Sequence, residues 1–158
     1  MKLGIISDSH YNWDAIDEAV CLADDVDIWF HAGDSIDDAQ YLEKVSGKKV
    51  YAVTGNVDWT SDGPANILVD IAGISIFMTH GHTYNVKATL DYLNEQAENL
   101  NADFVIYGHS HVGLKKNIGA RLFVNPGSVS EPRDGLFPSF MTAIIENKQI
   151  HIERIFIK

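Results

Sequence analysis

Five short apolar segments of this chain are each followed at once by a cluster of aspartate, asparagine, histidine or glycine residues. The clusters begin at Asp8, Gly33, Gly55, His80 and Gly108. Amphipathic stretches with helical spacing separate the first three apolar segments, and strands that alternate with helices indicate βαβ units and a parallel sheet. Because ligands bind beyond the carboxyl ends of the strands in such sheets, we expect all five clusters to converge on one site.

The expected elements alternate in the first third of the chain and become antiparallel strands toward its end. We predict β-strands at 3–6, 26–30, 49–53, 67–71, 74–78, 104–107, 113–117, 122–124, 140–145 and 150–157. We predict amphipathic helices after the capping residues Asn12 and Asn85, and a third helix over 38–45. A long polar loop spans 54–64, and Asn147-Lys148 predicts a hairpin turn. The pattern predicts a single α/β domain over 1–158, with two sheets and helices outside them.

The charge and the apolar pattern narrow the classes of function. The 158 residues include 22 acidic and 12 basic side chains, for a net charge of −10. A binder of long nucleic acid needs a basic footprint, so we expect no such partner, whereas bound cations would still attract a small phosphate substrate. No apolar run is long enough to span a membrane, and a cytoplasmic protein is the default expectation. The only cysteine, Cys21, excludes an intrachain disulfide, and its place in a helical pattern predicts burial.

The side chains in the clusters are typical metal ligands. Carboxylates, carboxamides and imidazoles without a thiolate favour Mn²⁺, Fe²⁺, Zn²⁺ or Ni²⁺. Asp8 and His10 are two residues apart, as are His109 and His111, so both members of each pair can face the same side of an extended chain. A carboxylate has two oxygens and can bridge two cations about 3.5–4 Å apart, which is the spacing of two-metal hydrolytic sites. The clusters therefore predict a site for divalent cations.

Each motif taken alone is also typical of an ordinary turn. Asp8-x-His10 could be a turn with a helix cap, and Gly33-Asp34 and Gly55-Asn56 are common turn dipeptides. The grouping favours a site, because scattered structural histidines would not order themselves at strand ends. Five of the seven histidines lie in these clusters, namely His10, His80, His82, His109 and His111.

The other polar residues near strand and helix ends fit structural roles. We expect His31 to be hydrogen-bonded, either in the core or beside the site, and His151 to be exposed on a C-terminal strand. Asp37 and Asp38 fit the start of a helix, where carboxylates suit the helix dipole.

The five motifs follow one another in an order that is specific to one family. Asp8-x-His10, Gly33-Asp34-x-x-Asp37, Gly55-Asn56-x-Asp58, His80-Gly81-His82 and Gly108-His109-x-His111 occur as in the calcineurin-like metallophosphoesterases. The chain resembles most closely the small YfcE-like phosphodiesterase branch, from position 3 to about position 145. It shares the Asn125-Pro126-Gly127-Ser128 segment of that branch, which would be a turn near the site, and Pro132-Arg133 just downstream. The resemblance implies a four-layer α/β sandwich in which helices flank two packed, mixed β-sheets.

The resemblance also implies roles for individual residues. One cation would be held by Asp8, His10, Asp34 and His111. The other would be held by Asp34, Asn56, His80 and His109, so that Asp34 is the shared bridge. Mn²⁺ is the cation we expect first, with Ni²⁺, Fe²⁺ and Zn²⁺ as alternatives. Asp58 would orient a histidine, Asn56 would also contact substrate, and Arg133 would contact the substrate phosphate or brace its loop.

One position departs from the family pattern. Many members carry a histidine directly after the Gly-Asn pair, where it helps to protonate the leaving group, whereas this chain has Val57. The departure favours phosphodiesters, or substrates whose leaving group departs easily. His82 could replace the missing acid or have a structural role. The implied reaction is hydrolysis of a small phosphate ester by attack of a metal-bridging hydroxide in line with the leaving oxygen.

Two other functions occur on the same fold. A non-catalytic interaction scaffold, like the retromer subunit of this fold, has a degraded ligand set, whereas all seven predicted ligand positions here hold competent side chains. A nuclease of the same superfamily would need a basic groove, which the acidic composition disfavours. We expect aromatic residues such as Trp59 and Phe137 to be exposed, where they could form a homodimer contact or cap the pocket.

Overall fold

A computed structural model describes residues 1–58 and 63–158, so Trp59 lies outside the described residues. Its strands are β1 (Lys2–Ile6), β2 (Ile28–His31), β3 (Lys49–Ala52), β4 (Asn66–Ile71), β5 (Ile74–Thr79), β6 (Phe104–Ile106), β7 (Leu114–Ile118), β8 (Arg121–Asn125), β9 (Ser139–Glu146) and β10 (Gln149–Phe156). Its helices are α1 (Trp13–Leu22), α2 (Ile36–Ser46) and α3 (Asp91–Asn99), with a short 3₁₀ helix, η1 (His82–Tyr84). Within these described ranges, every helix is too short or too polar to cross a membrane.

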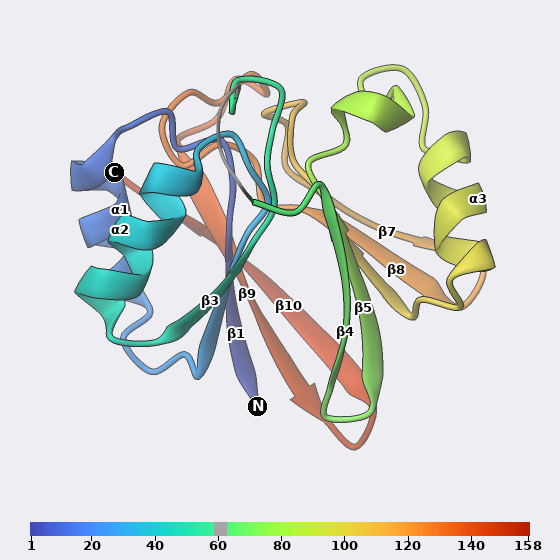
Figure 1. The fold of residues 1–158 in the computed structure, drawn as a ribbon. Helices are drawn as coiled ribbons and strands as arrows, with labels where there is room; N and C mark the ends of the chain where they lie inside the picture. Colours follow the sequence, from blue (N-terminus) through green and yellow to red (C-terminus); the bar gives the residue numbers. More distant parts are fainter. Residues whose placement is uncertain (59–62) are drawn as a thin grey trace.

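The strands form two mixed sheets of five strands each (Figure 1). The first sheet has the order β10-β9-β1-β2-β3, and the second has the order β4-β5-β6-β8-β7. β1, β2 and β3 run parallel, as do β5, β6 and β8, whereas β4, β7, β9 and β10 pair antiparallel with their neighbours. Parallel strands end at the same edge of a sheet, so the loops after β1, β2, β3, β5 and β6 gather at the top of Figure 1. The predicted parallel start and antiparallel end of the chain are both confirmed.

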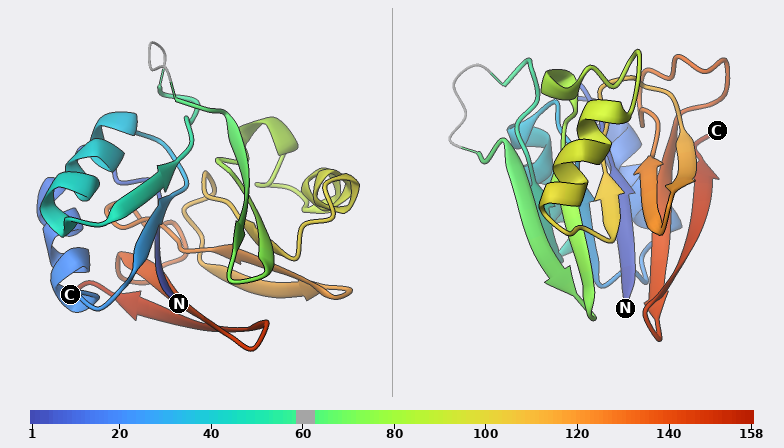
Figure 2. Two further views of the ribbon diagram at one scale, coloured as in Figure 1. Left: turned by 60° about the horizontal axis from the view of Figure 1, so that its bottom comes forward. Right: turned by 90° about the vertical axis from the view of Figure 1, so that its right-hand side faces the viewer.

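Helices cover the outer faces of both sheets, which gives the molecule four layers (Figure 2). The two sheets face each other across a buried core that includes Phe30 and Phe104. α1 and α2 pack on the other face of the first sheet, around Trp29, and α3 packs on the second sheet through Leu93. The predicted four-layer α/β sandwich is therefore confirmed.

Several local signals in the sequence act as expected. The Asn12 side chain caps α1 by accepting a hydrogen bond from the Ala15 amide at 3.1 Å. Asn147-Lys148 turns the β9–β10 hairpin with φ values of 51° and 59°, and positive φ at both positions is what a two-residue type I′ turn requires. His151 and Phe137 are exposed, as predicted.

Two predictions about the helices are wrong. α3 begins at Asp91 rather than after Asn85, because Asn85 has a left-handed φ of 53° and turns the chain away from a helical path. Val86, which we expected on the helix, lies before it and is still buried against the second sheet. Cys21 is exposed rather than buried, since other residues form the buried face of α1, namely Ala15, Ile16 and Ala19.

Candidate metal centre

Loops from both sheets bring ionisable side chains into one cluster at the top edge of the molecule. The first sheet contributes residues that follow β1 and β2, and the second contributes residues that follow β5 and β6. The members of the cluster are Asp8, His10, Asp34, His80, His109 and His111. These are six of the seven side chains that the sequence predicts as ligands.

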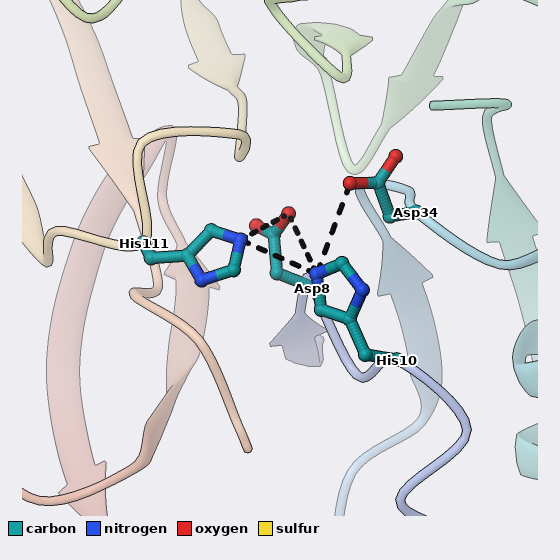
Figure 3. Close-up of side chains that lie close together, drawn as sticks. All are labelled: Asp8, His10, Asp34 and His111. Carbon is teal, nitrogen blue, oxygen red and sulfur yellow. Dashed lines mark hydrogen bonds and ion pairs between the residues drawn. The ribbon is translucent and has the colours of Figure 1, made fainter. Parts of the chain in front are cut away.

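The first group within this cluster contains four side chains whose ligand atoms all lie within 4.8 Å of one another: Asp8, His10, Asp34 and His111. In Figure 3 the two imidazole rings lie on either side of the Asp8 carboxylate, and Asp34 points toward His10 from the loop after β2. His111 Nε2 is 3.3 Å from Asp8 Oδ1, and His10 Nε2 is 3.8 Å from Asp34 Oδ2. The structure thus brings together the four side chains predicted for one cation.

The second group contains Asp34, His80 and His109, within the same limit of 4.8 Å. His80 Nε2 is 3.2 Å from Asp34 Oδ1, and the ring centroids of His80 and His109 are 5.1 Å apart. Asp34 turns one oxygen toward His10 and the other toward His80, so it belongs to both groups. This placement suits a carboxylate that bridges two cations.

Backbone hydrogen bonds fix the orientation of two of the imidazole rings. His80 Nδ1 donates to the Ala32 carbonyl at 2.7 Å, and His111 Nδ1 donates to the Glu131 carbonyl at 2.6 Å. In a neutral ring the other nitrogen then carries a lone pair, and here it faces carboxylate oxygens that also carry lone pairs. Asp8 Oδ1 and His80 Nε2 are buried without a hydrogen-bond partner among the described residues. Because unpaired buried polar atoms are costly, the arrangement fits positive ions between these groups.

The pKa shifts in the cluster show the same preference for positive charge between these groups, whether a proton or a cation supplies it. Burial lowers the pKa of His80, but contact with Asp34 and the charges of Asp8 and Asp34 outweigh burial, so the pKa is raised. Burial raises the pKa of Asp8, but bonds from its neighbours and the charge of His80 outweigh burial, so the pKa is lowered. Burial lowers the pKa of His109 to about 4, and the charges of His80 and Lys87 act in the same direction. His109 is therefore neutral at pH 7, which is the form of histidine that binds a cation.

Two glycines leave space for the carboxylates of the cluster. A Cβ atom at Gly108 would overlap Ser7 Oγ and lie 2.8 Å from Asp8 Oδ2, and one at Gly55 would overlap Asp34 Oδ1. The absence of a side chain at these positions lets the backbone approach the two aspartates closely.

The remaining residues predicted for the site lie around the two groups. Asn56 is exposed and precedes Val57, whose amide donates to Asp34 Oδ1 at 3.4 Å. The exposed ring of His82 has its centroid 5.4 Å from that of His80. Both residues therefore lie near the cluster, and their predicted roles as ligand and acid stay predictions.

Asp58 has partners other than the histidine that we predicted. Its carboxylate accepts hydrogen bonds from the amides of Gly55 at 2.8 Å and Ile36 at 3.0 Å, and no histidine bonds to it in the ranges that the structure describes. The bond to an amide three residues back is typical of a short aspartate side chain in a turn, which competes for local backbone groups. Asp58 therefore braces the loop of Asn56 against the start of α2.

Two cationic side chains flank the two groups. Arg133 is exposed, its amide donates to the His111 carbonyl at 3.0 Å, and its guanidinium is close enough for its charge to act on the His111 ring. Lys87 is placed similarly beside His109. No motif contains Lys87, which lies in the irregular segment before α3, so the sequence offers no signal for it.

The segment from Asn125 to Ser128 is the turn beside the site that the resemblance implies. Ser128 Oγ donates to the Asp8 carbonyl at 2.8 Å, and Asn125 Nδ2 donates to the Gly108 carbonyl at 3.0 Å. These bonds join the loops after β1, β6 and β8.

Asp134 anchors the far end of the loop that begins at this turn. Its carboxylate accepts hydrogen bonds from Arg154 Nη2 at 2.6 Å and from the amides of Gly113 and Leu136, both at 3.1 Å. Burial raises the pKa of Asp134, but these bonds outweigh burial, and the pKa lies below its ordinary value.

We expect Asp134→Asn to lower the free energy of unfolding by about 1.5–3 kcal/mol at pH 7, as for other hydrogen bonds to charged groups. Because the pKa is lower in the folded state, this contribution is fully present above the unfolded pKa of about 4 and is lost as pH falls through the folded pKa. Chemical denaturation from pH 7 to pH 3 should therefore show the two stabilities converging in acid. Asp37→Asn, at an exposed position, is the control. A difference that stayed constant across this range would exclude the ion pair as its cause.

Comparison with known sequences agrees with this geometry. Residues 1–148 match the calcineurin-like phosphoesterase superfamily domain. The probable metallophosphoesterase YsnB of Bacillus subtilis is 32% identical over 149 residues, which cover 93% of this chain and 86% of that protein. The phosphodiesterase MJ0936 of Methanocaldococcus jannaschii is 30% identical over 145 residues, which cover 80% of this chain and 83% of that protein.

Solved structures have the same fold. A Streptococcus pneumoniae protein described as a predicted phosphoesterase superposes with a TM-score of 0.85 at 26% identity, over 98% of this chain and 88% of that one. Vps29 from Entamoeba histolytica, solved with Zn²⁺, superposes with a TM-score of 0.77 at 21% identity over 99% of both chains, which shows a shared fold alone. By its sequence match, its fold and its cluster of aspartates and histidines, this chain belongs to the calcineurin-like phosphoesterase superfamily.

Proposed function

We propose that the protein is a phosphoesterase that uses two divalent cations and favours phosphodiesters, with residues 1–158 working as one domain. The proposal rests on one observation: two groups of carboxylate and imidazole side chains share Asp34. One cation would be held by Asp8, His10, Asp34 and His111, and the other by Asp34, Asn56, His80 and His109. Mn²⁺ is the cation we expect first, with Ni²⁺, Fe²⁺ and Zn²⁺ as alternatives, because these ligands accept several divalent ions.

The residues of the chain prepare the site for chemistry on a phosphate group. Bound cations would lower the pKa of a water between them and offset the charge of the phosphoryl oxygens. The carbonyls of Ala32 and Glu131 hold two imidazole rings ready, so little reorganisation is needed when a substrate arrives. Arg133, whose charge acts on His111, and Lys87, whose charge acts on His109, would add positive charge near the phosphate. Asn56 would contact the phosphate from the loop after β3.

The leaving group must depart without the histidine that many relatives carry. Val57 is 42% exposed and can transfer no proton. His82 is our candidate acid, but burial and the charge of His80 lower its pKa. A lower pKa leaves less of the protonated form that a general acid must supply at neutral pH. Substrates whose leaving group departs without a proton should therefore react best.

A metal-supplemented assay with matched aryl esters tests this function. Metal is first removed from the protein with a chelator, and Mn²⁺ or Ni²⁺ is then added back. The protein is given either a monoester, p-nitrophenyl phosphate, or a diester, bis-p-nitrophenyl phosphate. We expect metal-dependent turnover of the diester and much slower turnover of the monoester. Equal or faster monoester turnover would refute our interpretation of Val57, and cation binding without turnover of either ester would favour the scaffold function.

The Val57→His variant tests directly whether the missing histidine limits the reaction. The exposed position has room for an imidazole, and a new acid should help phenyl esters more than p-nitrophenyl esters, by up to about 10²–10⁴-fold. Leu68→His, at a position on β4 that is 47% exposed, is the control for adding a histidine elsewhere.

The charge of the chain bears on the kind of substrate and partner. With 22 acidic and 12 basic residues, we propose a small phosphate ester rather than long nucleic acid as the substrate. We also propose a cytoplasmic location. Phe137, which is 59% exposed on the loop of Arg133, is our candidate for a homodimer contact or a cap on the pocket.

A further inference from the structure

The loop after β1 has an unusual backbone. Asp8, His10 and Tyr11 all have φ in the left-handed region, at 54°, 46° and 62°. Residues other than glycine seldom adopt this conformation, and a segment with three of them persists only where neighbouring groups hold it. Because the loop carries two of the four residues of the first group, whatever holds it also positions that group.

The Asp38 carboxylate is the support that spans this loop. It is fully buried in the first turn of α2. It accepts hydrogen bonds from Ser9 Oγ at 2.6 Å, the Tyr11 amide at 2.8 Å and Trp13 Nε1 at 2.9 Å. One carboxylate therefore bonds the loop at three places from its beginning to the start of α1.

The start of α2 indicates that Asp38 is not needed there as a cap. Ser35 caps the helix by accepting a hydrogen bond from the Asp38 amide at 3.1 Å. In a capping box, the residue at the position of Asp38 would return its side chain to the amide of the cap. Here the carboxylate turns to the loop after β1 instead.

Ser9 and His31 complete a buried chain of hydrogen bonds. The Gly33 amide donates to His31 Nδ1 at 3.3 Å, so the proton of the neutral ring lies on Nε2, which donates to Ser9 Oγ at 2.9 Å. Ser9 Oγ donates in turn to Asp38 Oδ2. Since this hydroxyl is fully buried and already bonded in both directions, the three residues form a brace rather than a nucleophilic triad. The prediction of a hydrogen-bonded His31 is thereby confirmed.

We propose that Asp38 is a positioning residue that holds the loop of Asp8 and His10 in the shape that the first cation requires. The inference rests on the proposed two-cation site and adds a residue that touches neither cation nor substrate. Without the carboxylate, the loop can relax from its left-handed backbone and carry His10 away from its partners. His80 and His109 lie on other loops and stay in place.

The role of Asp38 is tested by calorimetric titration with Mn²⁺ of the Asp38→Asn variant and the unchanged protein, both freed of metal with a chelator. Asparagine keeps the shape of the side chain but turns an NH₂ group toward partners that are themselves donors. We expect one of the two binding steps to weaken by roughly 10–100-fold, as when an outer partner of a metal ligand is removed, and the other step to keep its affinity. Saturating Mn²⁺ should then restore diester turnover with an unchanged KM, which a general loss of structure would not allow.

Asp37→Asn is the matched control, because Asp37 is exposed in the same helical turn and the change of charge is the same. It should bind both ions as the unchanged protein does. If Asp38→Asn bound both ions normally, or lost both steps together without rescue by Mn²⁺, the inference would be overturned and the proposed function would stand. If the unchanged protein bound fewer than two ions, both would be overturned.

Trp13→Phe provides a second variant if Asp38→Asn does not fold. It removes one donor to Asp38 from a side chain that is 47% exposed, and the phenyl ring can still stack on Tyr41. The same binding step should weaken by a smaller factor. Unchanged binding of both ions by Trp13→Phe would also count against Asp38 as the positioning residue.

Discussion

Replacing Asp34 with asparagine should abolish metal-dependent turnover and weaken the binding of both cations together. One oxygen of Asp34 faces His80 and the other faces His10, so both groups lose the charge of the shared carboxylate. We expect kcat/KM to fall by more than about 100-fold, since loss of even an outer partner of a metal ligand costs roughly 10–100-fold. Calorimetric titration with Mn²⁺ measures the two binding steps, and the diester assay measures the rate.

Asp103→Asn is the control for the change of charge. Asp103 is exposed before β6, at the opposite end of that strand from the site, and accepts a hydrogen bond from the Ser75 amide at 2.9 Å. Its replacement should leave both binding steps and the rate unchanged. Normal turnover by Asp34→Asn would show that Asp34 is not the bridge, and loss of a single step would assign it to one cation alone.

The edge of the sheet that holds the site could be predicted from the sequence because strand ends are easy to recognise. A buried strand is short and apolar, and the first polar residue after it marks the edge where parallel strands end together. Asp8, Asp34, His80 and His109 follow such strands and are therefore expected near one another, and the structure brings them together. Local patterns, together with the rule that ligands bind beyond these strand ends, are enough to predict this edge.

Other parts of the site depend on contacts between segments that are distant in sequence. A carboxylate in the first turn of a helix has the same local pattern whether it is exposed, as Asp37 is, or buried, as Asp38 is. The direction of the Asp38 side chain is set by a loop 27 residues away. The left-handed backbone at Asn85, which delays α3, is likewise absent from the helical periodicity that predicted a cap there.

Gly55→Ala should impair the site by crowding the shared carboxylate. A Cβ atom at this position would overlap Asp34 Oδ1 and lie 2.7 Å from Asp34 Cγ. The backbone of Gly55 is outside the left-handed region, so alanine itself is tolerated and the overlap must be relieved by movement of Asp34 or of the loop. We expect kcat/KM to fall by about 100-fold, because a displacement of about 1 Å can cost that much. Thermal unfolding should show that the free energy of unfolding falls by about 1–3 kcal/mol, as for other overpacked positions.

Gly119→Ala is the control, because it strains the backbone without crowding any neighbour, whereas Gly55→Ala crowds a neighbour without straining the backbone. No heavy atom lies within 4 Å of a Cβ at Gly119, but its φ of 60° is left-handed. Alanine there should cost about 1–2 kcal/mol of stability through its backbone and leave turnover unchanged. If Gly55→Ala kept its rate and both Mn²⁺ binding steps, the carboxylate of Asp34 would have room to move, and its exact placement would not limit the reaction. If instead the variant with the unstrained backbone loses activity and the strained one keeps it, crowding of Asp34 is the cause.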